Sequence, residues 1–208
     1  MKRITVVACM LLVAASASTQ KLPGKILQLA AGYSRHGSGD LNGIVFGTEY
    51  GRYTSKKTSF NYYFRGSINN GIDRIIINNS ITGTRQDASI RYTTAGVQAG
   101  INVRHSFIRN QQHELLIGFG VFGRYQSASN GSDGYYLYHP AVTGVPTILV
   151  EYNNRTPQKT YSAGALIQLQ YNFTFSKNIT VGLAPGFQTD TNGDAIMQAV
   201  LIVGKRFR

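Results

Sequence analysis

The stretch Tyr161–Phe175, YSAGALIQLQYNFTF, decides the fold, because its side chains change character at every second position. Its even-numbered positions are small or polar apart from Leu166. Its odd-numbered positions form an apolar row with aromatic residues at both ends: Tyr161, Ala163, Ala165, Ile167, Leu169, Tyr171, Phe173 and Phe175. A period of two predicts a β-strand, because successive side chains of a strand point to opposite faces. At about 3.3 Å per residue, such a strand is long enough to cross a bilayer core even when tilted.

The same period recurs along the chain, which predicts an all-β protein with eight strands. The other segments are 26–36, 41–54, 58–69, 89–104, 112–127, 178–188 and 194–207. In hydrocarbon, an open sheet edge would leave backbone N–H and C=O groups unpaired at a cost of several kcal/mol each, on the order of the transfer cost of an unbonded amide. An even number of strands can close, so we expect an eight-stranded antiparallel transmembrane β-barrel.

The links between these segments fall into a short set and a longer set. The short links are 55–57, 105–111 and 176–177, whereas the other set is 37–40, 70–88, 128–159 and 189–193. Outer-membrane barrels have short periplasmic turns and longer extracellular loops. The alternation therefore predicts an orientation with both ends of the barrel domain on the periplasmic side. The apolar run Thr147–Tyr152 leaves a ten-stranded barrel open as an alternative.

The composition favours a barrel in lipid over a soluble one. Charged residues make up 14% of the chain, against roughly 25% in a typical soluble domain. The mean hydropathy is only −0.14, which is too low for a helical membrane protein but fits strands whose polar row is hidden inside a barrel. In a soluble lipocalin-like barrel the Gly, Gln, Asn and Ser row would face water, where a more charged surface is expected.

The N-terminus has the pattern of a secretory signal peptide. Lys2 and Arg3 precede an apolar run from Ile4 to Ala15, and small residues follow. We predict a signal peptide over residues 1–17 and a barrel domain over residues 18–208. The only cysteine, Cys9, lies inside the apolar run, so the exported chain would have no thiolate for a zinc site or a nucleophile.

On this pattern of strands and links the chain resembles the small outer-membrane β-barrel family typified by the OmpA transmembrane domain and OmpX, the porin-family barrel domain. The resemblance covers the whole chain after the signal peptide and implies a place in the bacterial outer membrane. It implies contact with outer-membrane lipid and lipopolysaccharide. It also implies recognition of a C-terminal aromatic residue by the barrel-assembly machinery during insertion, for which Phe207, one place before the end, is the candidate.

Polar and charged residues on the inward row are the first candidate site. They are Glu49, Arg65, Gln98, Arg104, Glu114, Arg124, Gln168 and Arg206. Charges inside a barrel must be paired or hydrated. They would either line a narrow porin-like channel for small solutes or fill the interior with ion pairs and hydrogen bonds. An eight-stranded barrel is just wide enough for side chains to fill, which favours the filled interior.

A lipid A-modifying enzyme is a further hypothesis, because His36 and Ser38 with Glu49 supply the residue types of a Ser/His/acid site. Lipid A 3-O-deacylases are small barrels of similar size that use such a set. The two residues lie in a glycine-containing turn near the N-terminus, which favours an ordinary hairpin tip. Histidines elsewhere are scattered and no metal-binding spacing is present, so we expect no enzyme, metal or cofactor.

The long link 128–159 is the second candidate site, through Tyr135, Tyr136 and Tyr138. Tyrosine-rich loops bind sugars or proteins by stacking and hydrogen bonding. The net charge of +12 comes from scattered basic residues, and no nucleic-acid-binding motif is present. We therefore expect a monomeric outer-membrane protein with a structural or surface-interaction role, in adhesion or recognition, that binds no nucleic acid.

Overall fold

The structure is a computed structural model that describes residues 24–207 with the exception of 38–40, 75, 79–84, 88, 131–133, 139, 145, 147, 153–157 and 176–177. The predicted signal peptide lies outside the described residues. Within them, no helix is long and apolar enough to cross a membrane.

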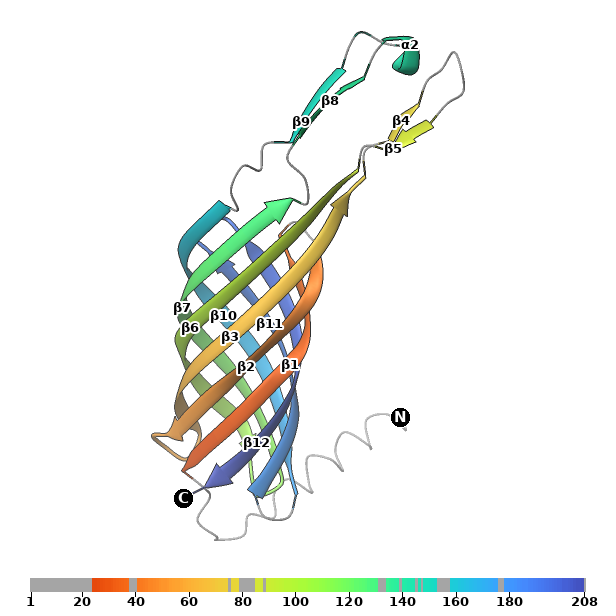
Figure 1. Ribbon diagram of the computed structural model, residues 1–208. Coiled ribbons are helices and arrows are strands. Elements are labelled where there is room, and N and C mark those ends of the chain that lie inside the picture. The colour runs from red at the N-terminus through yellow and green to blue at the C-terminus, as the bar shows by residue number, and fades with distance from the viewer. Residues whose placement is uncertain are drawn as a thin grey trace, which may run out of the picture.

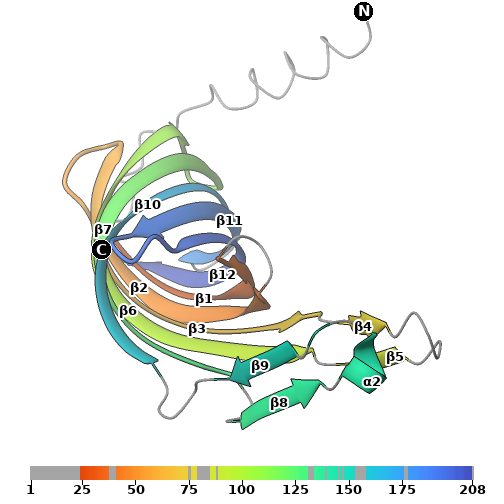
Figure 2. The ribbon, with the colours of Figure 1, turned by 90° about the horizontal axis from the view of Figure 1, so that it is seen from above.

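Eight long strands close into one antiparallel barrel, as predicted (Figures 1 and 2). They are β1 (Lys25–His36), β2 (Leu41–Tyr53), β3 (Thr58–Asp73), β6 (Ile90–Arg109), β7 (His113–Asn130), β10 (Gln158–Thr174), β11 (Ile179–Asp190) and β12 (Ala195–Phe207). Their order around the barrel is β1-β12-β11-β10-β7-β6-β3-β2. The seam closes between the first and last strands, where Lys25 lies opposite Phe207 and His36 lies opposite Ile196.

Exposed and buried side chains alternate along the strands, as the period of two in the sequence predicts. In β10 the apolar Leu169 is 47% exposed, whereas its neighbours Gln168 and Gln170 are 2% and 0% exposed. The same alternation gives β1 an exposed Leu29 at 60% and a buried Gln28 at 2%. The outer surface is therefore apolar and the interior polar, the arrangement of a barrel whose outside faces lipid.

The two ends of the barrel differ as the lengths of the links predict. The periplasmic end carries the turns 54–57 and 110–112 and the link between β10 and β11. Asn110 shapes the second of these turns, because its Oδ1 accepts hydrogen bonds from the backbone N–H groups of Gln112 and His113 at 2.9 and 2.6 Å. The extracellular end carries the remaining links, two of which contain β-hairpins.

These hairpins stand beyond the same end of the barrel (Figure 1). The first hairpin pairs β4 (Ile76–Asn78) with β5 (Arg85–Asp87). The second pairs β8 (Gly134–Tyr138) with β9 (Ile148–Tyr152), and the short helix α2 (Pro140–Thr143) lies between β8 and β9 in the chain. Each is a separate two-stranded sheet, so the ten-stranded alternative is wrong. Ser89 donates hydrogen bonds to the exposed Asp87 carboxylate and lowers its pKa.

Several strands run longer than predicted, and β6 departs most from its predicted bounds. We expected a turn over 105–111, but β6 continues through Arg109 and the turn is confined to 110–112. The register with β7 shifts between Ser106 and Ile108, which marks a β-bulge. The alternation of exposure continues through Phe107, so the predicted boundary at Arg104 came too early, and the bulge then breaks the alternation over the last residues of the strand.

Candidate functional site

All eight polar residues predicted for the inward row lie at buried positions in the lumen. Their exposed fractions run from 0% for Glu114 to 7% for Gln98; the others are Glu49, Arg65, Arg104, Arg124, Gln168 and Arg206. They belong to different strands and form separate groups at successive heights along the barrel. The lowest group lies at the periplasmic end of the barrel and the uppermost at the extracellular mouth.

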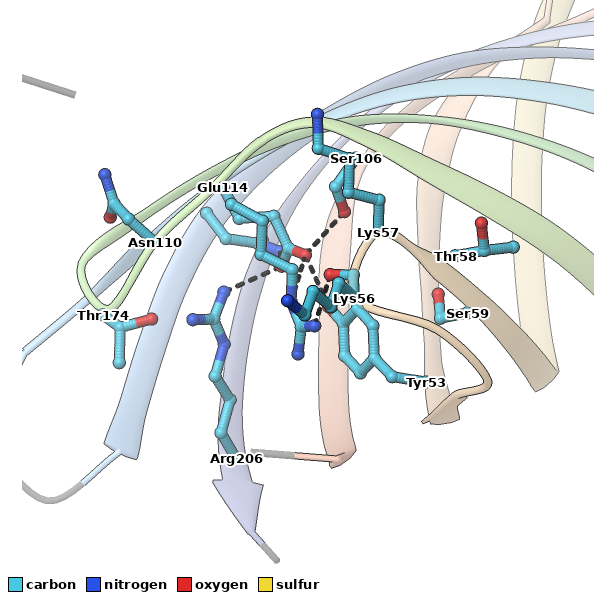
Figure 3. A network of polar contacts seen from close by, with 12 residues as sticks. Tyr53, Lys56, Lys57, Thr58, Ser59, Ser106, Asn110, Glu114, Thr174 and Arg206 are labelled. Carbon is cyan, nitrogen blue, oxygen red and sulfur yellow. Dashed lines mark hydrogen bonds and ion pairs between the residues drawn. The ribbon is translucent and has the colours of Figure 1, made fainter. Parts of the chain in front are cut away.

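The lowest group is centred on Glu114, the second residue of β7 (Figure 3). Its carboxylate accepts a hydrogen bond from Arg206 of β12 at 2.8 Å and forms an ion pair with Arg109 of β6 at 3.4 Å. Three neutral donors also bind it: the Tyr53 hydroxyl at 2.6 Å, the Ser106 hydroxyl at 2.8 Å and the Asn172 amide at 3.2 Å. One carboxylate therefore ties five strands together across the lumen.

A cation–π contact strengthens this group. The Arg109 guanidinium lies 3.4 Å from the centroid of the Tyr53 ring, whose hydroxyl donates to Glu114. Tyr53, Ser106 and Arg109 were not predicted as members of this site. For Ser106 the signal was the alternation that continues past Arg104, and for Arg109 it would have been the continuation of the strand past the bulge in β6.

The middle group is centred on Glu49 of β2. Its Oε2 atom lies 2.5 Å from Nη2 of Arg104 and 3.5 Å from Nη2 of Arg65. Gln168 accepts a hydrogen bond from Arg65 at 2.9 Å, and Gln170 accepts one from Arg104 at 2.7 Å. One carboxylate is shared by two guanidiniums, each of which also donates to a glutamine oxygen. The group joins β2, β3, β6 and β10 through the centre of the barrel.

Apolar side chains and a glutamine pair fill the lumen alongside and above these charges. Tyr63, Phe122 and Leu166 pack together in a buried cluster. A Cβ at Gly100 would lie 2.6 Å from the Tyr63 ring and 2.4 Å from the Val121 carbonyl oxygen, so this position has room only for glycine. Gln98 and Gln188 then exchange two hydrogen bonds of 3.0 and 2.9 Å between β6 and β11. A small cavity adjoins this pair, lined in part by Ser34 and Gln198.

The uppermost group lies at the extracellular mouth. His36 contacts Gln126 at 3.3 Å and Asp194 at 3.5 Å through its Nε2 atom. Gln126 donates to the same Asp194 carboxylate at 3.2 Å. Arg124 is 3% exposed and lies within this region of β7. Asp194 was not predicted for this group, because it lies in a turn and its partners across the mouth become its neighbours only when the barrel closes.

The geometry does not assemble the predicted Ser/His/acid set. Glu49 lies opposite Gln28 of β1 and is held by arginines, whereas His36 is at the far end of the same strand. Eight residues of strand at about 3.3 Å each separate these levels, on the order of 26 Å. The acid beside His36 is Asp194 instead, and Ser38 lies outside the described residues. Within the described part of the chain, no group of three or more His, Cys, Asp or Glu side chains is placed to hold a metal ion.

The backbones of Tyr135, Tyr136 and Tyr138 all lie on β8, so the three tyrosines predicted for the long link sit in the second extracellular hairpin. They pair in register with Glu151, Val150 and Ile148 of β9. Their strand is not part of the barrel wall. The hairpin is therefore the part of the 128–159 link that projects away from the membrane.

The fold defined by these strands is that of the small outer-membrane β-barrels. Scans of protein-family models and of curated proteins give no match. Among solved structures, Neisserial surface protein A (NspA) matches with a TM-score of 0.55 at 9% identity, covering 90% of this chain and 100% of that one. Ail, the attachment invasion locus protein of Yersinia pestis, matches with a TM-score of 0.51 at 10% identity and the same coverage.

The N-terminal β-barrel domain of Pseudomonas aeruginosa OprF also matches, with a TM-score of 0.51 at 11% identity and again 90% and 100% coverage. At such identities the likeness establishes the fold and not the activity. The resemblance to the OmpA- and OmpX-like barrels is thus confirmed for the fold, and this fold supports a place in the outer membrane.

Proposed function

We propose that this protein is an exported outer-membrane barrel that acts through its extracellular hairpins in adhesion or surface recognition, with the barrel as its anchor. One observation carries the proposal. Buried charge networks fill the lumen at the Glu49 and Glu114 levels, while two β-hairpins project beyond the rim. The parts of the chain that can meet a large partner are therefore outside the barrel.

A filled lumen argues against a role as a pore. At the Glu49 level the carboxylate, two arginines and two glutamines join four strands across the interior. An ion moving along the lumen would have to break these contacts at one level and the five contacts of Glu114 at another. Each break exposes a buried unpaired charge, which is expensive.

The same geometry argues against the lipid-modifying enzyme. His36 is 4% exposed and points into the mouth of the barrel, toward Gln126 and Asp194. A lipid substrate would approach from the outer, apolar surface. A buried imidazole that already has partners in the lumen is not placed to activate a nucleophile for that substrate.

The remaining parts of the proposal concern partners and targeting. Residues 1–17 act as the signal peptide, Phe207 is read by the assembly machinery, and the folded protein is a monomer in contact with lipid and lipopolysaccharide. The surface ligand binds through the 128–159 link, with Tyr135, Tyr136 and Tyr138 as contact candidates. Support comes from the fold shared with Ail, named as an attachment protein, and with NspA, named as a surface protein.

The test compares the two hairpins on bacteria that display the full chain. One variant replaces residues 134–152 with a short Gly-Ser linker, and the matched variant does the same for residues 76–87. Binding is measured to a printed glycan array and to immobilised extracellular-matrix proteins. We expect the first variant to lose binding that the second keeps. Binding that survives replacement of both hairpins would contradict the proposal.

A further inference from the structure

Three basic residues gather on the outer surface at the periplasmic end, on one side of the barrel. They are Lys25 on β1, Arg52 on β2 and Lys205 on β12, which are neighbouring strands. Each lies on the outward row, because the adjacent Ile26, Gly51 and Arg206 are buried in the lumen. Arg52 and Lys205 are exposed and Lys25 is half-buried. We call these three residues the basic seam.

The strand register brings these like charges close together. Lys25 lies directly opposite Arg52 in the β1–β2 pair. In the β1–β12 pair Lys25 lies opposite Phe207, which makes Lys205 its diagonal neighbour. Residues directly opposite have Cβ atoms about 5 Å apart and diagonal ones about 7–8 Å, and like charges directly opposite destabilise a sheet. An arrangement of this kind calls for an anion.

The described part of the protein does not supply that anion. None of the three side chains forms an ion pair with a described residue. The described acidic residue nearest to the periplasmic turns is Glu114, which is 0% exposed and is held inside the lumen by Arg206 and Arg109. Among the described residues the basic seam therefore has no counter-charge, which leaves it open to an anion from outside the protein.

The level of the basic seam indicates what that counter-charge is. Phe60 lies opposite Arg52 in the β2–β3 pair, and Phe207 lies opposite Lys25. The Phe60 ring packs edge-on against Tyr62, which is 56% exposed on the same outward row. Aromatic residues on the outside of a barrel mark the membrane interface, where lipid phosphates lie. Outward-facing cations at this level meet headgroups rather than bulk solvent.

The other side of the barrel is different at the same level. The outward residues there include Tyr171 and Phe173 of β10 and Ile179 of β11, which are aromatic or aliphatic. Among the described residues at this end, the other exposed lysines, Lys56 and Lys57, lie in the β2–β3 turn next to Arg52, on the same side as the basic seam.

We propose that the basic seam is a binding site for an anionic phospholipid of the inner leaflet, in which a phosphate group neutralises Lys25, Arg52 and Lys205 together. Because the phosphate contacts both β1 and β12, the lipid bridges the strands where the barrel closes. The site lies on the opposite end from the hairpins and does not depend on their function. Its attraction would weaken at high salt.

The experiment is a competition measured by native mass spectrometry. The full barrel is equilibrated in detergent with equal amounts of phosphatidylglycerol and phosphatidylcholine that carry the same acyl chains, and retained lipid is counted. We expect the wild type to retain phosphatidylglycerol preferentially. The triple variant Lys25→Gln, Arg52→Gln, Lys205→Gln should bind it on the order of a hundredfold more weakly, given the usual contribution of each basic residue at a membrane surface.

The matched control neutralises three exposed basic residues near the extracellular end, Arg85→Gln, Arg91→Gln and Lys159→Gln, and should keep the preference. Heat-modifiable mobility in SDS checks that each variant folds. If the triple variant does not fold, the single variant Arg52→Gln replaces it, and its retention of phosphatidylglycerol should be partly lost. Equal retention by wild type and triple variant would overturn the site. Displacement of the lipid by inorganic phosphate at the same concentration would show that the basic seam binds soluble anions instead of a phospholipid. Lower membrane yield of the triple variant with unchanged lipid binding would point instead to a periplasmic protein.

Discussion

The lumen and the extracellular hairpins use the same strand geometry for opposite purposes. In the lumen, Glu114 is 0% exposed and has contacts to five other side chains from four strands besides its own. The β4–β5 hairpin, in contrast, has three paired positions and an exposed Arg85 and Asp87. We infer from this difference that stability is concentrated in the barrel interior, so that the hairpins can change without unfolding the protein.

The largest effect expected from this comparison is that of Glu114→Ala. The substitution leaves Arg206 and Arg109 without their shared carboxylate in a buried site. Removing one partner of a buried ion pair costs about 3–5 kcal/mol. The urea midpoint for folding into detergent should fall accordingly. The midpoint of Glu114→Gln should fall less, because glutamine keeps the shape of the side chain and some of its hydrogen bonds. An unchanged midpoint for Glu114→Ala would show that the group does not hold the barrel together.

A smaller effect is expected from Gly100→Ala. The added methyl group would lie 2.4 Å from the Val121 carbonyl oxygen and 2.6 Å from the Tyr63 ring. Overpacking of this kind costs about 1–3 kcal/mol. The control is Gly123→Ala on the outer surface, where a Cβ has nothing within 4 Å. Equal urea midpoints for the two variants would mean that the lumen is not tightly packed around Tyr63.

The smallest effect on folding is expected from replacing the hairpins. Neither β4–β5 nor β8–β9 pairs with a strand of the barrel. Replacing residues 76–87 or 134–152 with a short linker should shift the free energy of unfolding by no more than about 0.5 kcal/mol, as for surface changes away from buried features. The measurement is the same urea titration. A large loss of stability would show that the hairpins brace the barrel, and would weaken the division of roles.

The alternation of side chains was enough to predict the barrel wall. It placed all eight strands, and it put Gln168 inside and Leu169 outside because a period of two leaves only one choice of face. The prediction ended β6 at Arg104 and so missed Ser106, where the alternation still holds, and Arg109, which lies beyond the bulge that breaks it.

Which lumen residues meet could not be predicted from the sequence. Glu114 and Arg206 are 92 positions apart, and Gln98 and Gln188 are 90 apart. Their contacts depend on the relative shift of all the strands between them once the sheet has closed. The pairing of His36 with Asp194 instead of Glu49 has the same cause. Alternation tells which face a side chain is on, but not the height of its partner across the barrel.

The central claim is that buried networks close the lumen and that the protein acts through its extracellular hairpins. The most direct test is single-channel recording of the purified, heat-modifiable barrel in a planar bilayer, beside a known porin as the positive control. We predict no stable conductance steps for the wild type, because the Glu49 and Glu114 levels both block the path. Stable, reproducible ion steps from the wild type would contradict the claim and make the lumen a channel.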